Sequence, residues 1–511
     1  MVKTFGSAVY GVEAITITIE VDIAGSSPHY FTVGLPDSAV REAILRVESA
    51  LNNSGYRMPR QKIVINLAPA DIRKEGSAYD LPIAIGILAA SGQISAGRLP
   101  DFLIMGELSL DGFVQPIKGA LPIAIQARRE KYAGFILPEN NAREAAIVND
   151  LEVYGARTLQ DVIGILEGEN SIPATVVDTR DEYFATLDRY EFDFSDVKGQ
   201  ENIKRALEIA AAGGHNVILI GPPGAGKTML AKRLPTILPP MSLSEALETT
   251  KIHSVAGKLS SNDSLLTTRP FRSPHHTVSD VALVGGGGNP QPGEISLAHN
   301  GVLFLDELPE FKRAVLEVMR QPLEERRVTI SRAKVTVDYP SSFMLVASMN
   351  PCPCGYYNHP EKDCVCGPGI VQKYLNGISG PLIDRIDLHV EVTPVHFDEL
   401  SSERSSEKSA GIRERVIRAR EIQQQRFAGT AMYCNAQMSA QAVRERCPIP
   451  EAGQNLLKKA MEKLGLSARA YDRILKVSRT IADLAGSEAI AIEHLAEAIH
   501  YRSLDREGWA G

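Results

Sequence analysis

The sequence predicts an α/β protein with a parallel β-sheet at its centre and a helical bundle at its end. The first observation is an apolar strand-like run, Val217–Ile220, that is followed by a glycine-rich loop and a helix-like segment. The second is the alternation of apolar strands and helices from residue 192 to about 395, which is typical of a parallel sheet. The third is helical spacing of apolar residues after residue 437.

Shifts in these patterns divide the chain into five parts. They are an α/β N-terminal domain, a linker around Pro173, a central α/β domain, a charged helical linker and a C-terminal helical lid, at residues 1–168, 169–191, 192–396, 397–436 and 437–511. In the first part, strands are expected over 15–21 and 62–67, and helices over 38–52 and 81–91. In the last part, Ser467 is expected to cap a helix that continues to Leu484 and ends at Gly486.

Composition limits the classes of protein that the chain can represent. Its 511 residues are enough for about three domains, and 44% of them are hydrophobic. No apolar run approaches the roughly 20 residues of a membrane span, and the first residues lack the apolar core of a signal peptide. A soluble cytoplasmic protein is therefore expected. With a net charge of −7, the protein surface as a whole is not positively charged. Any nucleic acid would therefore have to bind a local patch of basic residues.

The loop after Val217–Ile220 has the composition of a phosphate-binding loop. Its glycines let backbone N–H groups approach phosphate oxygens, and the following helix adds a partial positive charge. Lys227 would reach the β- and γ-phosphates of ATP, and Thr228 would hold Mg²⁺. A plain strand-to-helix turn is the alternative, which the flanking strand and helix disfavour. The candidate nucleotide-binding residues are Gly221, Pro222, Pro223, Gly224, Ala225, Gly226, Lys227, Thr228 and Met229.

Two later strands end in polar residues that suit ATP hydrolysis. The run 301–305 ends at Asp306 and Glu307, where Asp306 would hold Mg²⁺ through water and Glu307 would polarise the attacking water. The run 343–349 ends at Asn350, whose amide would orient water against the γ-phosphate. The alternatives are a solvated acidic turn at 306–307 and a simple turn at Asn350 before Pro351.

Two arginines stand at unusual positions. Arg385 lies between the apolar positions Ile383 and Ile386, which favours an arginine that stabilises charge on a neighbouring subunit's ATP. A structural salt bridge with Asp384 or Asp387 is the alternative. Arg469 falls in the first turn of the helix that Ser467 caps, where the helix dipole disfavours a positive charge. An anionic ligand nearby would explain it.

Together these motifs resemble the ComM/YifB family, in the magnesium-chelatase-like branch of the AAA+ ATPases. Further matching motifs are the runs at 33–36, 66–71, 272–276 and 351–355, so the resemblance covers nearly the whole chain. It implies that Asn350 is the sensor-1 residue, Arg385 the arginine finger and Arg469 the sensor-2 residue. It also implies a ring-shaped homo-hexamer with ATP between subunits. Members studied as ComM move DNA branches during natural transformation.

The N-terminal domain resembles the proteolytic domain of Lon, with a ribosomal-S5-domain-2-like fold, at residues 74–80 and 106–117. Lon-type peptidases need a serine nucleophile and a lysine base. Ala78 and Leu121 occupy those two positions here, and Ser77 and Lys118 are out of register. We therefore expect a noncatalytic domain that stacks as a second ring on the ATPase.

Four of the six cysteines form two Cys-x-Cys pairs, Cys352 with Cys354 and Cys364 with Cys366. Four thiolates in a Gly/Pro-rich loop predict a closed tetrahedral Zn²⁺ site with a structural role. The alternatives are four reduced thiols without metal, or His359 as a replacement ligand. Cys434 and Cys447 are expected to be ordinary thiols.

Two segments are candidates for DNA contact in the pore of a ring. Residues 328–337 alternate on both sides of a short tip, which predicts a β-hairpin with Arg332 and Lys334 at the tip. An exposed hairpin with solvated charges is the alternative. The glycine-rich segment 269–292 resembles the helix-2 insertion of the same branch, and its His275 and His276 suit a structural or phosphate-contact role.

The leading hypothesis is a Mg²⁺-dependent hexameric ATPase that moves on single-stranded, forked or junction DNA and drives branch migration. A protein-remodelling motor of the magnesium-chelatase type is the alternative, which the Lon-like domain disfavours. A Lon-like protease is opposed by Ala78 and Leu121.

Overall fold

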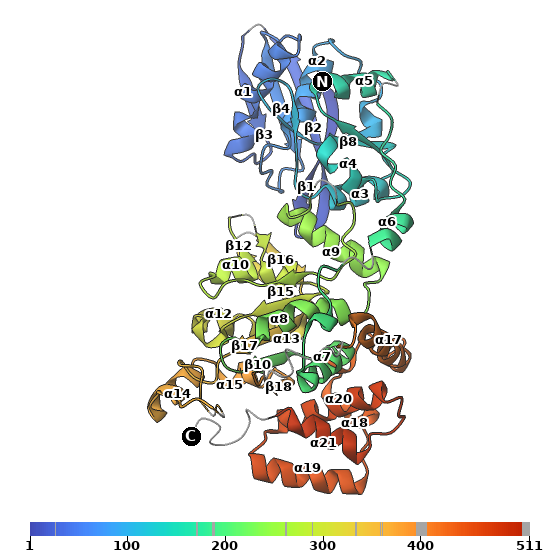
Figure 1. Cartoon of the computed structure of the whole chain (residues 1–511). Helices are drawn as coiled ribbons and strands as arrows, with labels where there is room; N and C mark the ends of the chain where they lie inside the picture. Colours follow the sequence, from blue (N-terminus) through green and yellow to red (C-terminus); the bar gives the residue numbers. More distant parts are fainter. Residues whose placement is uncertain are drawn as a thin grey trace.

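The structure is a computed structural model that describes residues 1–25, 27–169, 172–186, 190–260, 263–288, 290–332, 335–357, 359, 361–394 and 406–502. Figure 1 shows the N-terminal α/β domain at the top, the central α/β domain below it and the C-terminal helices at the bottom. Among the described residues, no helix combines the length and apolarity that crossing a membrane requires.

The N-terminal domain is built on a seven-stranded sheet with the order β3-β4-β2-β1-β5-β8-β9. Strands β1, β2 and β4 pair antiparallel, whereas β3–β4, β1–β5, β5–β8 and β8–β9 pair parallel. Its strands are β1 Val2–Tyr10, β2 Glu13–Ala24, β3 Tyr30–Val33, β4 Lys62–Ala68, β5 Phe102–Ile104, β6 Glu107–Leu108, β7 Val114–Gln115, β8 Gly134–Pro138 and β9 Glu152–Ala156. Its helices are α1 Ser38–Asn53, α2 Asp80–Ala90, α3 Ala120–Arg129, α4 Glu139–Ala145 and α5 Leu159–Glu167.

Alternation of buried and more exposed residues along β2 explains how this sheet forms its core. Ile17, Ile19 and Val21 point to one face and are fully buried, as expected for a strand with one face on the core. Helix α2 is buried at almost every position, because its sequence is apolar all round. The four elements expected in this domain from the sequence are β2, β4, α1 and α2, with boundaries within a few residues.

The central domain contains a parallel five-stranded sheet with the order β11-β14-β17-β10-β18. Its strands are β10 Val217–Ile220, β11 Phe271–Arg272, β14 Val302–Leu305, β17 Met344–Met349 and β18 Leu388–Glu391; the small pairs are β12 Gly285–Gly286 with β13 Gln291–Pro292, and β15 Arg327–Arg332 with β16 Val335–Pro340. Its helices are α7 Glu201–Gly213, α8 Lys227–Arg233, α9 Leu243–Ala256, α10 Asp280–Val284, α11 Glu294–Leu297, α12 Arg313–Glu317, α13 Arg320–Glu325, α14 Pro368–Leu375 and α15 Gly380–Ile383.

Strands β10, β14 and β17 lie side by side in the middle of this sheet and are buried at every residue. Continuous apolar strands of this kind belong to parallel sheets that are covered on both faces. Their carboxyl ends meet at one edge of the sheet, which is where the predicted site residues follow.

The C-terminal part consists of α17 Ser409–Arg426, α18 Ala440–Arg446, α19 Glu451–Leu464, α20 Ala468–Leu484 and α21 Ile492–His500. The side chain of Ser467 accepts the backbone N–H of Ala470, so the expected N-cap of α20 is confirmed. Helix α17 shares one buried hydrophobic cluster with α7, β10 and the lid. The segment that we predicted to be a helical linker is therefore part of that core.

The predicted linker 169–191 contains a short helix, α6 Thr179–Thr186. Weak apolar periodicity hid this helix, and Glu182 on it forms an ion pair with Arg143 of the N-terminal domain.

Helix α9 lies at the junction between the two α/β domains (Figure 1). Its Ala246 belongs to the buried cluster of the N-terminal domain, and the carbonyl of Ser254 accepts the N–H of Gly119 at 3.1 Å. The turn between β1 and β2 contacts the β15–β16 hairpin, where the hydroxyl of Tyr10 donates to the carbonyl of Thr336 at 3.4 Å.

Candidate functional site

The glycine-rich loop connects the end of β10 to the start of α8. Gly224 and Gly226 have φ values of 78° and 84°, which glycine adopts without strain. A Cβ on Gly221 would lie 2.2 Å from the carbonyl oxygen of Val392, so a larger residue would not fit. The loop thus brings its backbone close around the helix N-terminus, the geometry that binds phosphate.

Lys227, the first residue of α8, is folded back into this loop. Its Nζ donates to the carbonyl oxygens of Gly221 and Pro222 at 2.7 and 3.0 Å, and to Oδ1 of Asn350 at 3.0 Å. Burial lowers the pKa of Lys227, and the carboxylates of Asp306 and Glu307 oppose that shift. A partly desolvated ammonium among carbonyls is suited to exchange these partners for phosphate oxygens.

Asp306 follows β14 and lies beside Thr228. The hydroxyl of Thr228 donates to Oδ2 of Asp306 at 2.8 Å, and the hydroxyl of Ser348 donates to Oδ1. A carboxylate and a hydroxyl side by side provide the oxygen ligands that Mg²⁺ prefers. The structure therefore brings together the two residues that the sequence suggested for Mg²⁺.

Glu307 has a backbone φ of 55°, which is uncommon for a residue other than glycine. Its Oε2 lies 3.4 Å from Nδ1 of His276, and its side chain is 56% exposed. The carboxylate is therefore accessible to water at the same sheet edge as Asp306.

The two arginines contact different acidic residues, Glu324 for Arg385 and Asp384 for Arg469. Arg385, between α15 and β18, is buried, and its guanidinium contacts Glu324 and the carbonyl of Pro381. Arg469, in the first turn of α20, lies 3.5 Å from Asp384 and is 67% exposed. Within one subunit, neither arginine is among the contacts of the phosphate loop described above. The role of Arg385 in a neighbouring subunit stays a prediction.

The four loop cysteines converge on one point. Their sulfur atoms all lie within 4.8 Å of one another, and Cys352, Cys354 and Cys364 are 3.3 to 3.6 Å apart. Four sulfurs at about 2.3 Å from one Zn²⁺ would lie about 3.8 Å apart, so the cluster is close to that size. A hydrogen bond from the backbone of Tyr356 lowers the pKa of Cys354 to about 6. At Cys364 and Cys366 a backbone hydrogen bond lowers the pKa, but burial and the neighbouring thiols raise it overall. Cys354 is therefore the thiol of these three that most readily forms the thiolate that binds metal.

This cysteine cluster adjoins the phosphate loop. It begins two residues after Asn350, and a Cβ on Gly355 would lie 2.4 Å from Cδ of Pro223. His359 is outside the cysteine cluster, since its Nδ1 accepts backbone N–H groups of Glu361 and Lys362 at 3.1 Å.

The expected hairpin is present as β15 and β16, paired antiparallel from Arg327–Pro340 to Arg332–Val335. Lys334 and the side chain of Arg332 lie outside the described residues. The glycine-rich insertion, residues 269–292, contains β11, α10, β12 and β13. The hydroxyl of Tyr339 in β16 donates to the carbonyl of Pro290 at 2.7 Å, so the hairpin and the insertion pack together.

The Lon-like positions of the N-terminal domain hold no serine–lysine pair. Ala78 and Leu121 occupy them, and the hydroxyl of Ser77 donates to Glu107. Lys118 lies against Gly257 at the end of α9. A buried lysine that the sequence analysis did not single out, Lys74, donates to the carbonyl of Pro69.

Three contacts near the phosphate loop were missed by the sequence analysis. Ser348 contacts Asp306, His276 faces Glu307, and the amide of Gln200 donates to the carbonyl of Ala225 at 2.9 Å. The signal available for Ser348 was its position as a polar residue within the otherwise apolar strand β17. His276 was noticed, but its partner depends on which strands are neighbours.

Comparisons with known proteins agree with this architecture. A family model described as magnesium chelatase, subunit ChlI, matches residues 193–400. Models described as subunit ChlI of Mg-chelatase and as its C-terminal part match residues 19–141 and 406–502.

Relatives match over nearly the full chain. Competence protein ComM of Haemophilus influenzae is 45% identical over 504 residues, covering 98% of this chain and 97% of that protein. The uncharacterized protein YifB of Escherichia coli is also 45% identical over 504 residues, with coverage of 98% and 96%. Lon protease 2 of Bacillus subtilis is 32% identical over 154 residues, or 27% of this chain and 26% of that protein. The chain therefore belongs to the magnesium-chelatase-like AAA+ ATPases and, among them, to the family of ComM and YifB.

Proposed function

We propose that this chain forms a Mg²⁺-dependent ATPase ring that moves along DNA and drives branch migration. The observation that supports ATP hydrolysis best is the meeting of Lys227, Thr228 and Asp306 at one sheet edge. In this proposal, Lys227 binds the β- and γ-phosphates, Thr228 and Asp306 hold Mg²⁺, and Glu307 takes the proton of the attacking water. The side chain of Asn350 gives up its hydrogen bond with Lys227 and orients that water.

A role on DNA is supported by two features. The β15–β16 hairpin and the glycine-rich insertion pack against each other, as two elements that respond to one ligand would. A relative with 45% identity is named a competence protein. The positively charged side chains of Arg332 and Lys334 at the hairpin tip would contact the phosphates of a DNA strand in the pore.

The central test is ATP hydrolysis with and without forked and four-way-junction DNA. Wild-type protein is expected to hydrolyse ATP faster with DNA and to unwind the junction. Glu307→Gln is expected to lower kcat by at least about 100-fold, the usual contribution of a general base, while ATP binding persists. Normal hydrolysis by Glu307→Gln would refute the assigned chemistry. ATPase activity that ignores DNA would favour the protein-remodelling motor instead.

A second test addresses the DNA contacts. The double substitution Arg332→Ala with Lys334→Ala is expected to weaken DNA binding and to flatten its salt dependence by about two charges. Arg327→Ala is the matched control, since Arg327 stands at the base of the same hairpin and pairs with Glu325. An unchanged salt slope in the double variant would remove the hairpin from the DNA interface.

A third test addresses the ring. Arg385 is proposed to act on ATP bound by the adjoining subunit, and Arg385 and Arg469 together are proposed to couple hydrolysis in one subunit to its neighbour. Arg385→Ala and Lys227→Ala are each expected to be inactive, but a mixture of the two is expected to recover part of the activity. Recovery occurs because some mixed interfaces combine an intact Lys227 with a neighbour's intact Arg385. A mixture that stays inactive would contradict the shared site.

We also propose that Cys352, Cys354, Cys364 and Cys366 hold a structural Zn²⁺. Four sulfurs leave no open coordination position, so the metal would brace the loop rather than take part in hydrolysis. Because Gly355 packs against Pro223, a loop held rigid by the metal would also stabilise the phosphate loop.

The N-terminal domain is proposed to be noncatalytic. ATP-dependent cleavage of casein by purified protein, abolished by Ser77→Ala, would overturn this assignment.

A further inference from the structure

The turn between β1 and β2 carries an apolar residue where a surface turn usually carries a polar one. Tyr10 pairs with Glu13 at the end of the β1–β2 ladder, so Gly11 and Val12 form a two-residue turn. Gly11 has a φ of 62°, which suits the first central position of such a turn. Surface turns favour polar residues, yet Gly11 is buried and Val12 is half-buried. Another part of the chain therefore covers this turn.

The β15–β16 hairpin of the central domain covers the turn. Val12 packs against the buried cluster that contains Val337 of β16. A Cβ on Gly11 would lie 2.8 Å from Cγ1 of Val337, and the hydroxyl of Tyr10 donates to the carbonyl of Thr336 at 3.4 Å. Three consecutive residues of the N-terminal domain thus pack against the same stretch of β16.

This contact lies next to the hairpin tip. The ladder of β15 and β16 ends at the pair Arg332–Val335, and Thr336 follows Val335 directly. A two-stranded hairpin is only marginally stable without a surface to pack on. At its base, the hairpin has such a surface in the glycine-rich insertion, which Tyr339 contacts. The β1–β2 turn supports the other end, beside the residues proposed to contact DNA.

The turn is anchored in the middle of a large sheet. Strands β1 and β2 pair along the whole length of β1 and occupy central positions in the seven-stranded sheet. The same domain is held a second time at α9, where the N–H of Gly119 donates to the carbonyl of Ser254 at 3.1 Å. A sideways load on the hairpin tip would therefore pass into the N-terminal sheet, because the turn resists bending of the hairpin.

We propose that the β1–β2 turn of the N-terminal domain holds the hairpin tip in position against DNA. In this way the noncatalytic domain couples ATP hydrolysis to DNA movement. Without the turn, the hairpin bends under load and ATP is hydrolysed with little movement of DNA. This inference rests on the proposed DNA motor and assigns a task to a domain that lacks the peptidase residues.

Val12→Asp separates the contact from the fold of the N-terminal domain. Gly-Asp is a common sequence for a two-residue hairpin turn, so the turn itself is expected to form. The new carboxylate would lie at an apolar contact and weaken docking of the turn. Ile15→Asp is the matched control, since it adds the same charge to an exposed position of β2, and none of the contacts described above involves Ile15.

The experiment measures junction unwinding and ATP hydrolysis in the same reactions, with full-length protein and saturating DNA. Val12→Asp is expected to unwind at least about threefold less DNA per ATP than wild type, because the burial of a half-buried valine is lost. Its DNA-free hydrolysis should equal that of wild type, and Ile15→Asp should keep the wild-type ratio. An unchanged ratio in Val12→Asp, including a proportional fall of both rates, overturns the proposal. An equal loss in Ile15→Asp overturns it as well.

Amide hydrogen exchange without DNA tests the contact independently of the motor. Val12→Asp is expected to speed exchange in β15 and β16 by at least about threefold, for the same loss of burial, and to leave β5 and β8 unchanged. Ile15→Asp should leave the hairpin as protected as in wild type. If wild-type protein neither unwinds DNA nor responds to it, the proposed motor fails, and the exchange result alone decides whether the turn holds the hairpin. Equal hairpin exchange in Val12→Asp and wild type overturns that support.

Discussion

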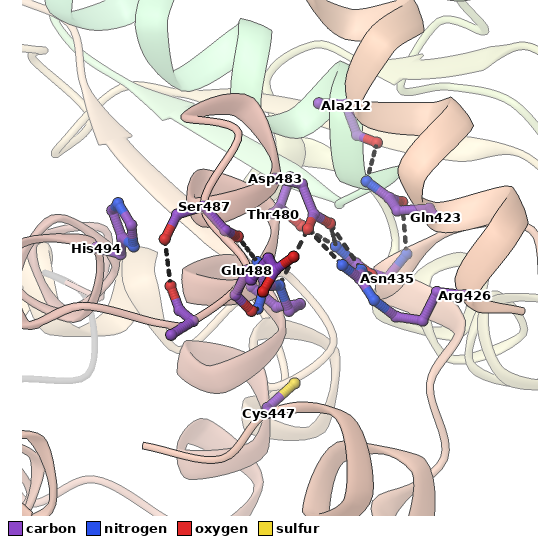
Figure 2. A network of polar contacts seen from close by, with 12 residues as sticks. Ala212, Gln423, Arg426, Asn435, Cys447, Thr480, Asp483, Ser487, Glu488 and His494 are labelled. Atoms are coloured by element: carbon purple, nitrogen blue, oxygen red, sulfur yellow. Dashed lines mark hydrogen bonds and ion pairs between the residues drawn. The ribbon is translucent and has the colours of Figure 1, made fainter. Parts of the chain in front are cut away.

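Replacing Asp483 with Asn is expected to loosen the helical lid that carries Arg469. Asp483, near the end of α20, has a fully buried side chain. Figure 2 shows it at the centre of a polar network. Arg426 of α17 donates to its two oxygens at 2.8 and 2.5 Å, Arg479 donates at 3.0 Å, and Asn435 donates at 2.8 Å. One carboxylate thus joins α17, α20 and the segment between α17 and α18.

The expected loss of stability in Asp483→Asn can be estimated from this geometry. Asn would keep one acceptor oxygen but would turn an NH₂ group toward guanidinium donors, and it would leave two buried cations without their anion. Removing one partner of a buried ion pair costs about 3–5 kcal/mol. Arg479 is 3% exposed and Arg426 is 14% exposed, so water compensates little. For a bundle of this size, the loss corresponds to a melting temperature lower by at least about 10 °C.

The assay is differential scanning calorimetry together with amide exchange of α20. The expected result is an early transition for the lid with faster exchange in α20, and weaker ATP binding because Arg469 begins the same helix. Asp472→Asn is the control, since Asp472 is on α20 but only partly buried. If both variants melt and bind ATP alike, the network does not hold the lid and the reasoning is refuted.

Two further predictions concern the cysteines and acid stability. Purified protein is expected to carry about one zinc per chain by elemental analysis; Cys364→Ser should lose it and Cys447→Ser should keep it, whereas less than about 0.2 zinc in the wild type would exclude the site. Burial alone would raise the pKa of Asp387, but the charge of Arg473 and the contact with His215 lower it. Its contribution to stability is therefore present above about pH 4 and is lost as the pH falls further. The stability difference between wild type and Asp387→Asn should shrink below about pH 4, and a constant difference in urea unfolding between pH 7 and 3 would contradict it.

The parts of the site that the sequence predicted share one property. Asp306 and Asn350 each follow a buried strand directly, and Lys227 follows the glycine-rich loop at the end of another, so strand patterns together with that loop locate them. Parallel strands bring their carboxyl ends to one edge, and the contacts from Lys227 to Asn350 and from Thr228 to Asp306 follow from that rule. The cysteine cluster was predictable for a similar reason, because all four thiols belong to one short loop.

The remaining contacts depend on the order of the strands, which the sequence pattern does not contain. His276 and Glu307 are 31 residues apart in the numbering, and only the pairing of β11 with β14 brings them together. The contact between Arg385 and Glu324 joins the turn after α15 to α13 across 61 residues. Helix α6 was missed because its eight residues show little periodicity. Helix α17 was expected, but as part of a linker, because its charged residues outnumber the few apolar residues that it buries.

Short contacts join the β15–β16 hairpin to Glu307, so the proposed effect of DNA on hydrolysis needs no large motion between domains. The hairpin touches the insertion through Tyr339, the insertion touches Glu307 through His276, and each contact is shorter than 4 Å. Packed side chains at such distances transmit displacements of about an ångström, because a protein interior is dense and does not compress. The turn between β1 and β2 rests on the same hairpin through Tyr10. A shift of the hairpin would therefore reach the N-terminal domain and the carboxylate of Glu307 together, and the two responses should be lost together when the hairpin is shortened.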